Sequence, residues 1–136
     1  LLPFADAVGA HASAVMVANA TVPGLSTVPA SISATVIQGV LRGELAFQGL
    51  VVTDSLSTPA LQAVGYSVPR AAVAALHAGA DMVLFNADAN SVASVTTQIV
   101  AAITSAVRRG ALARNTVEGA VAHVLATKHV NLCALA

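Results

Sequence analysis

Three short runs of apolar residues, AVMVA at 14–18, LVVT at 50–53 and MVLF at 82–85, stand out along the chain. Each is four or five residues long, rich in Val, Leu and Met, and free of polar alternation. Such runs are typical of parallel strands that are buried on both faces. They begin 36 and then 32 residues apart, which fits a strand, a helix and two loops in each repeat. The pattern therefore predicts three parallel strands joined by helices.

Proline and glycine mark the ends of two predicted helices. Pro3 suits the first turn of a short helix over 2–10, because a proline there loses no helical hydrogen bond. Pro69 is placed in the same way for a helix over 68–77, and Gly79 suits the position directly after it.

Polar caps and apolar stripes predict the remaining helices. Ser33 is placed to cap a helix that runs to Arg42, and Asn115 with Glu118 resembles a capping pair for a last helix. The apolar face expected for that last helix consists of Val117, Val121, Val124 and Leu125. A further apolar stripe at helical spacing consists of Val92, Val95, Ile99, Ile103 and Val107.

The order of elements is then α-β-α-β-α-α-β-α-α, with strands near 14–19, 50–54 and 82–86 adjacent in that order. Parallel strands of one sheet are joined by right-handed crossovers. This α/β pattern is compatible with a small doubly wound sheet or with part of a (β/α)8 barrel. A complete barrel takes about 250 residues and eight strands, so 136 residues supply only a part of one.

The composition excludes several classes of protein. The chain is 57% hydrophobic and carries six basic and six acidic residues, so it has neither the low hydrophobicity of a disordered chain nor the basic excess of a nucleic-acid binder. Its mean hydropathy of +0.81 raises the question of a membrane segment. The longest stretches without charge, 7–41 and 89–107, contain prolines, glycines or many hydroxyl groups. We therefore expect no transmembrane segment.

In a parallel α/β protein, reactive groups gather at the carboxyl ends of the strands. The polar residues expected at that edge are Asn19, Asp54, Ser55, Ser57, Asn86 and Asp88. Asp54 directly follows the second strand, and from position alone it is equally well read as a functional carboxylate or as a cap for a helix near Pro59. Asp88 is better read as the cap of a helix from Asn90. Asp81 and Glu44 fall at the opposite edge, where residues serve stability.

No metal or phosphate motif accompanies these residues. The four histidines lack the spacing of metal ligands, and we read them as structural or surface residues. The single cysteine, Cys133, allows no internal disulfide and is read as incidental. Neither a nucleophile elbow, a P-loop nor a dinucleotide fingerprint occurs in the sequence.

Four stretches together resemble one enzyme family: PASIS at 29–33, LRGELAFQG at 41–49, LVVTDSLS at 50–57 and AALHAGADMVL at 74–84. In this succession they are similar to the second half of the catalytic barrel of glycoside hydrolase family 3, nearest to its bacterial β-N-acetylglucosaminidases. The likeness covers nearly the whole chain and is most specific from PASIS through LVVTDSLS. It implies that residues 1–136 are one segment, the C-terminal half of that catalytic domain.

The resemblance implies a role for Asp54. In the family, the aspartate after this strand is the nucleophile of a retaining glycosidase, which forms a glycosyl-enzyme intermediate that water then hydrolyses. A His-Asp pair on an earlier loop acts as acid and base, and a Lys-His-Phe-Pro-Gly-His-Gly segment helps to hold the sugar. Neither stretch occurs in these 136 residues. No metal or organic cofactor is implied.

Two positions depart from the family pattern. Ser55 stands where the family usually has a second acid, and Asn19 stands where most relatives carry a histidine. An asparagine still hydrogen-bonds a sugar hydroxyl but carries no proton charge. We therefore expect Asn19 and Ser55 to contact the substrate beside the Asp54 nucleophile.

The leading hypothesis is a family 3 hydrolase that removes terminal β-linked N-acetylglucosamine from cell-wall fragments or similar glycosides, with Asp54 supplied by this chain. The alternative is a non-catalytic or degenerate half-barrel that pairs with another chain. A third interpretation makes Asp54 and Asp88 an acid/base pair. As a barrel fragment, the chain has an open apolar edge, and we expect it to associate with the missing barrel half or with a second copy of itself.

Overall fold

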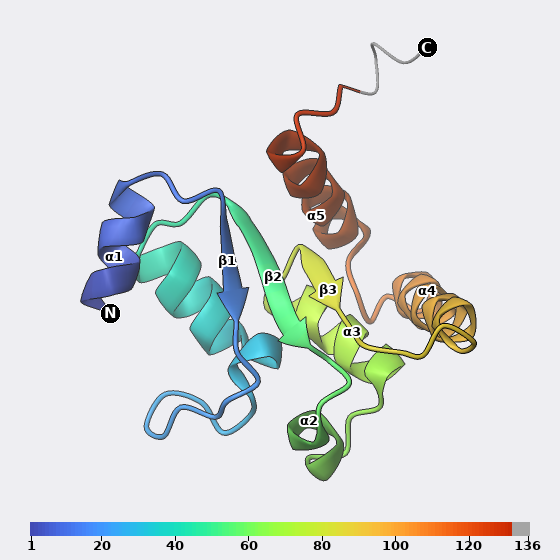
Figure 1. The fold of residues 1–136 in the computed structure, drawn as a ribbon. Coiled ribbons are helices and arrows are strands. Elements are labelled where there is room, and N and C mark those ends of the chain that lie inside the picture. The colour runs from blue at the N-terminus through green and yellow to red at the C-terminus, as the bar shows by residue number, and fades with distance from the viewer. Residues whose placement is uncertain (132–136) are drawn as a thin grey trace.

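The computed structural model describes residues 1–131 and shows three parallel strands with helices around them (Figure 1). The strands are β1 (Ala14–Val17), β2 (Leu50–Ser55) and β3 (Met82–Leu84), in the order β1-β2-β3. Both pairings are parallel, with Val17 opposite Thr53 and Val52 opposite Met82. The predicted strands, their order and their direction are confirmed. The sheet is open, as expected for part of a barrel.

The helices follow the predicted order. They are α1 (Leu2–Gly9), the 3-10 turn η1 (Ala30–Ile32), η2 (Thr35–Glu44), α2 (Pro59–Ala63), α3 (Val68–Ala78), α4 (Val92–Arg108) and α5 (Arg114–Thr127). Gly79 follows α3 with φ 104, the left-handed conformation that favours glycine at a helix end. The helix over 35–44 is a π-helix, and the Leu45 N–H donates to the Val40 carbonyl at 2.9 Å.

The predicted cap of the last helix is wrong. The helix α5 begins at Arg114, one residue before Asn115, and has no side-chain cap. Glu118 instead accepts a hydrogen bond from Arg114 Nε at 2.7 Å, because residues four apart share a helix face. This hydrogen bond, and to a lesser extent the negative charge of Glu118, raise the pKa of the Arg114 guanidinium. The predicted cap at Ser33 is supported: its Oγ accepts from the Val36 N–H at 3.4 Å and its carbonyl accepts from the Ile37 N–H at 3.0 Å, although η2 itself is assigned from Thr35.

Only the middle strand is buried along most of its length. On β2, Val51 and Thr53 are fully buried, whereas Met16 on β1 is 55% exposed and Leu84 on β3 is 41% exposed. The expectation that all three strands are buried on both faces is therefore wrong for β1 and β3. Both are edge strands of the described sheet, and Met16 lines an open groove beside β1.

The core lies between the sheet and the helices behind it. Its largest fully buried side chains include Ile37, Phe47, Leu56 and Leu61. A smaller cluster of Leu76, Ala106, Leu112 and Ala120 joins α3, α4 and α5. The predicted apolar face of α5 is only partly confirmed, since Val121 is 51% exposed and Ala120 is the buried residue.

Candidate functional site at the carboxyl edge of the sheet

Asp54 lies at the carboxyl end of β2. Its side chain alternates with those of the buried Thr53 and Ser55, and it therefore shares the half-buried sheet face of Val52. Its Oδ1 accepts a hydrogen bond from the Ser55 N–H at 2.7 Å. Within residues 1–131, no basic side chain pairs with this carboxylate.

The capping interpretation of Asp54 is wrong. The helix α2 begins at Pro59, with Thr58 as its N-cap residue, and no side chain caps it. The Thr58 hydroxyl is itself buried and has no hydrogen-bond partner within residues 1–131. Asp54 therefore serves no helix end, and its second oxygen, Oδ2, has no bonding partner in the described part of the chain.

Asn19 lies beside the end of β2, two residues beyond the last backbone pair of β1. Its Nδ2 donates to the Ser55 carbonyl at 2.7 Å, and its Oδ1 accepts from Ser31 Oγ at 2.5 Å. Ser31 and Ser55 are both buried. The structure therefore brings Asn19, Ser55 and Asp54 together, and it adds Ser31, which the sequence did not single out.

Ser57 joins the loops that follow β2 and β3. Its Oγ donates to the Asn86 carbonyl at 2.8 Å and accepts from the Asn86 N–H at 3.0 Å. Both residues were expected at this edge. Their contact holds the two strand ends together near Asp54.

Asp88 takes no part in this cluster. It is exposed, and its backbone carbonyl accepts hydrogen bonds from Ser91 and Val92, both at 2.9 Å. The helix α4 begins at Val92 rather than near Asn90 and has no side-chain cap, so the predicted capping role of the Asp88 carboxylate is wrong. Among the described residues, no hydrogen bond or ion pair joins Asp88 to Asp54.

The amino edge of the sheet holds a second carboxylate. Asp81, whose side chain is 6% exposed, accepts from Arg42 and from the Val51 N–H through Oδ2, at 2.7 and 2.8 Å. Its Oδ1 lies 2.7 Å from His123 Nδ1 on α5. Arg42 also donates to the Phe47 and Gly49 carbonyls. Asp81 thus has the structural role expected at this edge, and His123 is its partner, which no local spacing indicated.

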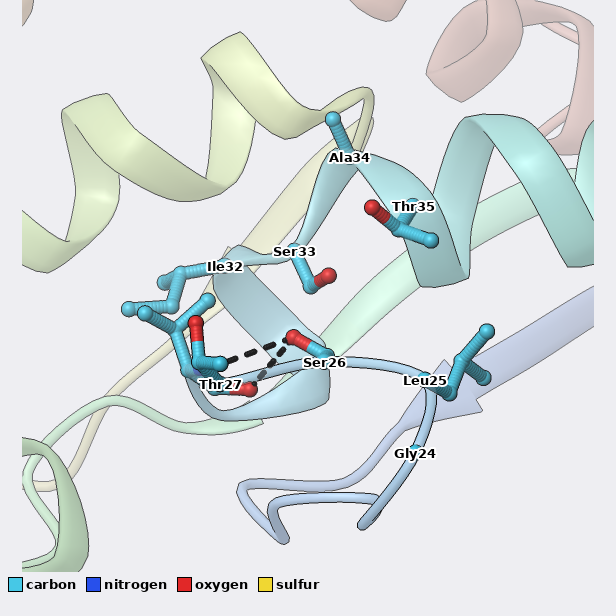
Figure 2. Close-up of a pocket in the computed structure, with 9 residues that line it drawn as sticks. Gly24, Leu25, Ser26, Thr27, Ile32, Ser33, Ala34 and Thr35 are labelled. Atoms are coloured by element: carbon cyan, nitrogen blue, oxygen red, sulfur yellow. Dashed lines mark hydrogen bonds between the residues drawn. The ribbon is translucent and has the colours of Figure 1, made fainter.

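A cavity of about 500 Å³ adjoins the carboxyl edge on the β1 side (Figure 2). The loop after β1 and the first turn of η2 form it, and Ser26, Thr27, Ser33 and Thr35 contribute hydroxyl groups to its lining. No ionisable side chain lines it. It therefore offers hydrogen bonds to a polar ligand but no general acid or base.

The fold and the site together define a parallel α/β protein that presents one carboxylate at the carboxyl edge of its sheet. The comparisons with known proteins agree with this class. The chain belongs to glycosyl hydrolase family 3, whose N-terminal domain matches residues 1–127.

Among curated relatives, a β-hexosaminidase of Xylella fastidiosa is 42% identical over 84 residues, which are 62% of this chain and 25% of that protein. A family 3 β-N-acetylglucosaminidase of Paenibacillus is 34% identical, with a TM-score of 0.84 over 93% of this chain and 24% of that one. A β-N-acetylhexosaminidase of Beutenbergia cavernae is 33% identical, with a TM-score of 0.82 over 95% of this chain and 37% of its own.

The chain thus spans about a quarter of the length of the curated relatives that it matches.

Among residues 1–131, none of the helices has the length and apolar character needed to cross a bilayer. Cys133 lies outside the described residues.

Proposed function

We propose that this chain supplies the nucleophile of a retaining glycoside hydrolase that removes terminal β-linked N-acetylglucosamine from cell-wall-derived or similar glycosides. The observation that carries the proposal is the Asp54 carboxylate, which lies at the carboxyl edge of the sheet with one oxygen held by Ser55 and the other without a partner in residues 1–131. Family membership and the names of the relatives support the class of substrate.

The chemistry follows from that position. Oδ2 of Asp54 attacks the anomeric carbon and forms a carbon–oxygen bond as the glycosidic bond breaks, and the departing oxygen keeps the electron pair and takes a proton. Water then attacks the anomeric carbon, gives a proton to the group that had protonated the departing oxygen, and displaces the carboxylate, which restores Asp54. The proton donor is a second group, the His-Asp loop that the resemblance implies, which these 136 residues do not contain.

Asn19 and Ser55 border the same position. Asn19 Nδ2 carries two N–H groups, of which one donates to the Ser55 carbonyl. The second N–H is the donor with which Asn19 would hold a sugar hydroxyl. The Ser55 side chain is mostly buried, so we expect it to contact the substrate less than Asn19 does.

Residues 1–136 form, in this proposal, one segment of a larger catalytic barrel. The apolar groove along β1 supports it: Phe4 and Met16 line this groove and are more than half exposed in the described structure. We propose that the other part of the barrel or a second copy of this chain covers it, because exposed strand edges and apolar patches favour association. The chain alone is then expected to give little or no turnover of a nitrophenyl N-acetylglucosaminide and to exceed a monomer's mass in solution.

A 5-fluoro N-acetylglucosaminyl fluoride tests the nucleophile directly, because fluoride leaves without help from a general acid. The whole natural polypeptide that carries this chain is treated with it, and the labelled peptide is mapped by mass spectrometry. The expected label is on Asp54, and D54N abolishes it, whereas the matched exposed variant D88N retains it. A label on another residue, or labelling of D54N, would refute the assignment. A protein that takes no label at all would support the non-catalytic alternative.

A further inference from the structure

Three successive hydrogen bonds connect the buried Ser31 with the Asp54 carboxylate. Ser31 Oγ donates to Asn19 Oδ1 at 2.5 Å, and Asn19 Nδ2 donates to the Ser55 carbonyl at 2.7 Å. The Ser55 N–H then donates to Asp54 Oδ1 at 2.7 Å. Asn19 thus holds the backbone of the residue that in turn holds the carboxylate.

Asn19 is itself fixed from both sides. The backbone carbonyls of Ala18 and Ala20 accept hydrogen bonds from the N–H groups of Ser31 and Ala30, at 3.0 and 2.9 Å. These two bonds tie the loop after β1 to the turn η1 on either side of Asn19. The Asn19 side chain therefore projects from a clamped piece of backbone rather than from a free loop.

The position of Asn19 in the sheet explains why its side chain matters. The backbone pairing of β1 with β2 stops at Val17 and Thr53, two residues before Asn19 and Ser55. Beyond that point, the hydrogen bond from the Asn19 amide to the Ser55 carbonyl continues the connection between the β1 and β2 segments as far as the residue next to Asp54. Ser31 is fully buried and Ser55 is 8% exposed, so little water competes for these bonds.

We propose that Asn19 is a positioning residue, which aims Asp54 through Ser55. This inference rests on the proposed function. With Oδ1 held by the Ser55 N–H, the free oxygen Oδ2 is the one presented for attack. An asparagine amide does not ionise, so its hold on Ser55 stays the same across the pH range in which carboxylates and histidines titrate.

Exchanging Asn19 for aspartate tests this role, because N19D keeps the shape but replaces the donor facing the Ser55 carbonyl with a carboxylate oxygen. The inactivation kinetics of the fluoro sugar in the whole natural polypeptide separate the rate constant of the chemical step from the binding constant. We expect the chemical step of N19D to slow by roughly 10–100-fold, the scale of a misplaced reacting group. The binding constant should change less than the rate constant, because only the chemical step depends on the aim of Asp54, whereas the second Asn19 N–H accounts for at most one sugar contact.

A pH series separates positioning from a general loosening of the fold. Protonation of the introduced carboxyl at low pH restores a donor to the Ser55 carbonyl, so the slowed step should recover relative to the wild type as the pH falls. The matched control is N86D, which adds the same charge at the same edge, where the Asn86 side chain makes no hydrogen bond in the described structure. A rate loss equal in both variants would overturn the proposal. So would weakened binding without a slower step, which would leave Asn19 with its sugar contact and no positioning role.

A second measurement stays informative even if Asp54 takes no label. Amide hydrogen exchange at Ser55, followed by NMR, should be at least roughly tenfold faster in N19D than in the wild type, and unchanged in N86D. Unchanged exchange in N19D would refute the positioning role independently of the reaction. Faster exchange in an unlabelled protein would refute the nucleophile and leave the structural link established.

Discussion

Two aspartates mark the two ends of the sheet, and their surroundings are opposite. Asp81 lies at the amino edge, where Arg42, His123 and the Val51 N–H occupy both of its oxygens. Asp54 lies at the carboxyl edge, where its one partner in the described chain is the N–H of the next residue. Asp54 lies near the end of β2 and Asp81 directly precedes β3, so the sequence places them at opposite edges of the sheet but does not identify their partners.

The number and kind of hydrogen-bond partners therefore separate an aspartate that stabilises the fold from one that is able to react. A carboxylate that is 6% exposed and accepts hydrogen bonds at both oxygens is closed to a substrate, and it joins elements that are distant in sequence. A carboxylate held by one local N–H is oriented but still able to react. The structural role of Asp81 is reinforced by its partner Arg42, which also donates to the Phe47 and Gly49 carbonyls and lies over the Phe47 ring.

The largest effect on stability is expected from D81A. It leaves the mostly buried Arg42 without its charge partner, and breaking a buried pair in this way costs about 3–5 kcal/mol. Urea unfolding followed by circular dichroism measures the loss, with D88A as the exposed control. The double variant D81A/R42M should lose less than the sum of the single changes, since it removes both charges. Strict additivity would show that the two side chains do not depend on each other.

A smaller effect is expected from H123A. The His123 side chain is 45% exposed, so the hydrogen bond that it makes with Asp81 is partly screened by water, and its loss should cost about 1 kcal/mol. The same unfolding measurement checks it against H77A, an exposed histidine at the end of α3. If H123A cost as much as D81A, the docking of α5 rather than Arg42 would dominate the amino edge.

The smallest effect on stability is expected from D54N. The asparagine oxygen still accepts from the Ser55 N–H, so the free energy of unfolding should change by less than about 0.5 kcal/mol while the labelling reaction is lost. Unfolding curves of D54N and the wild type should therefore superimpose. A loss above about 2 kcal/mol would place Asp54 with Asp81 among the structural residues and remove the contrast between the two edges.

The sequence predicted the order of the elements well, for a local reason. Apolar runs such as LVVT and signals such as Pro69 and Gly79 act through backbone preferences that need no distant partner. The prediction failed where distant contacts decide. Met16 is exposed because β1 has a neighbouring strand on one side only in the described sheet. Val121 is exposed because α5 packs Ala120, not Val121, against α3 and α4.

Asp54 was a candidate from position and resemblance, but only the structure removed its capping interpretation, since α2 starts at Pro59 without a side-chain cap. The links from Ser31 to Asn19 and from Asn19 to Ser55 span 12 and 36 residues, and the contact between His123 and Asp81 spans 42. No local spacing encodes such pairs.

Backbone preference and apolar periodicity are local properties of the chain, and they suffice to predict the three strands, the helices between them and the aspartates at the strand ends. The hydrogen-bond partners of those aspartates come from folding, which occupies both oxygens of Asp81 and leaves Oδ2 of Asp54 without a partner in residues 1–131. This difference depends on donors such as Arg42, His123 and Asn19, which only folding brings within hydrogen-bonding distance of one strand end or the other.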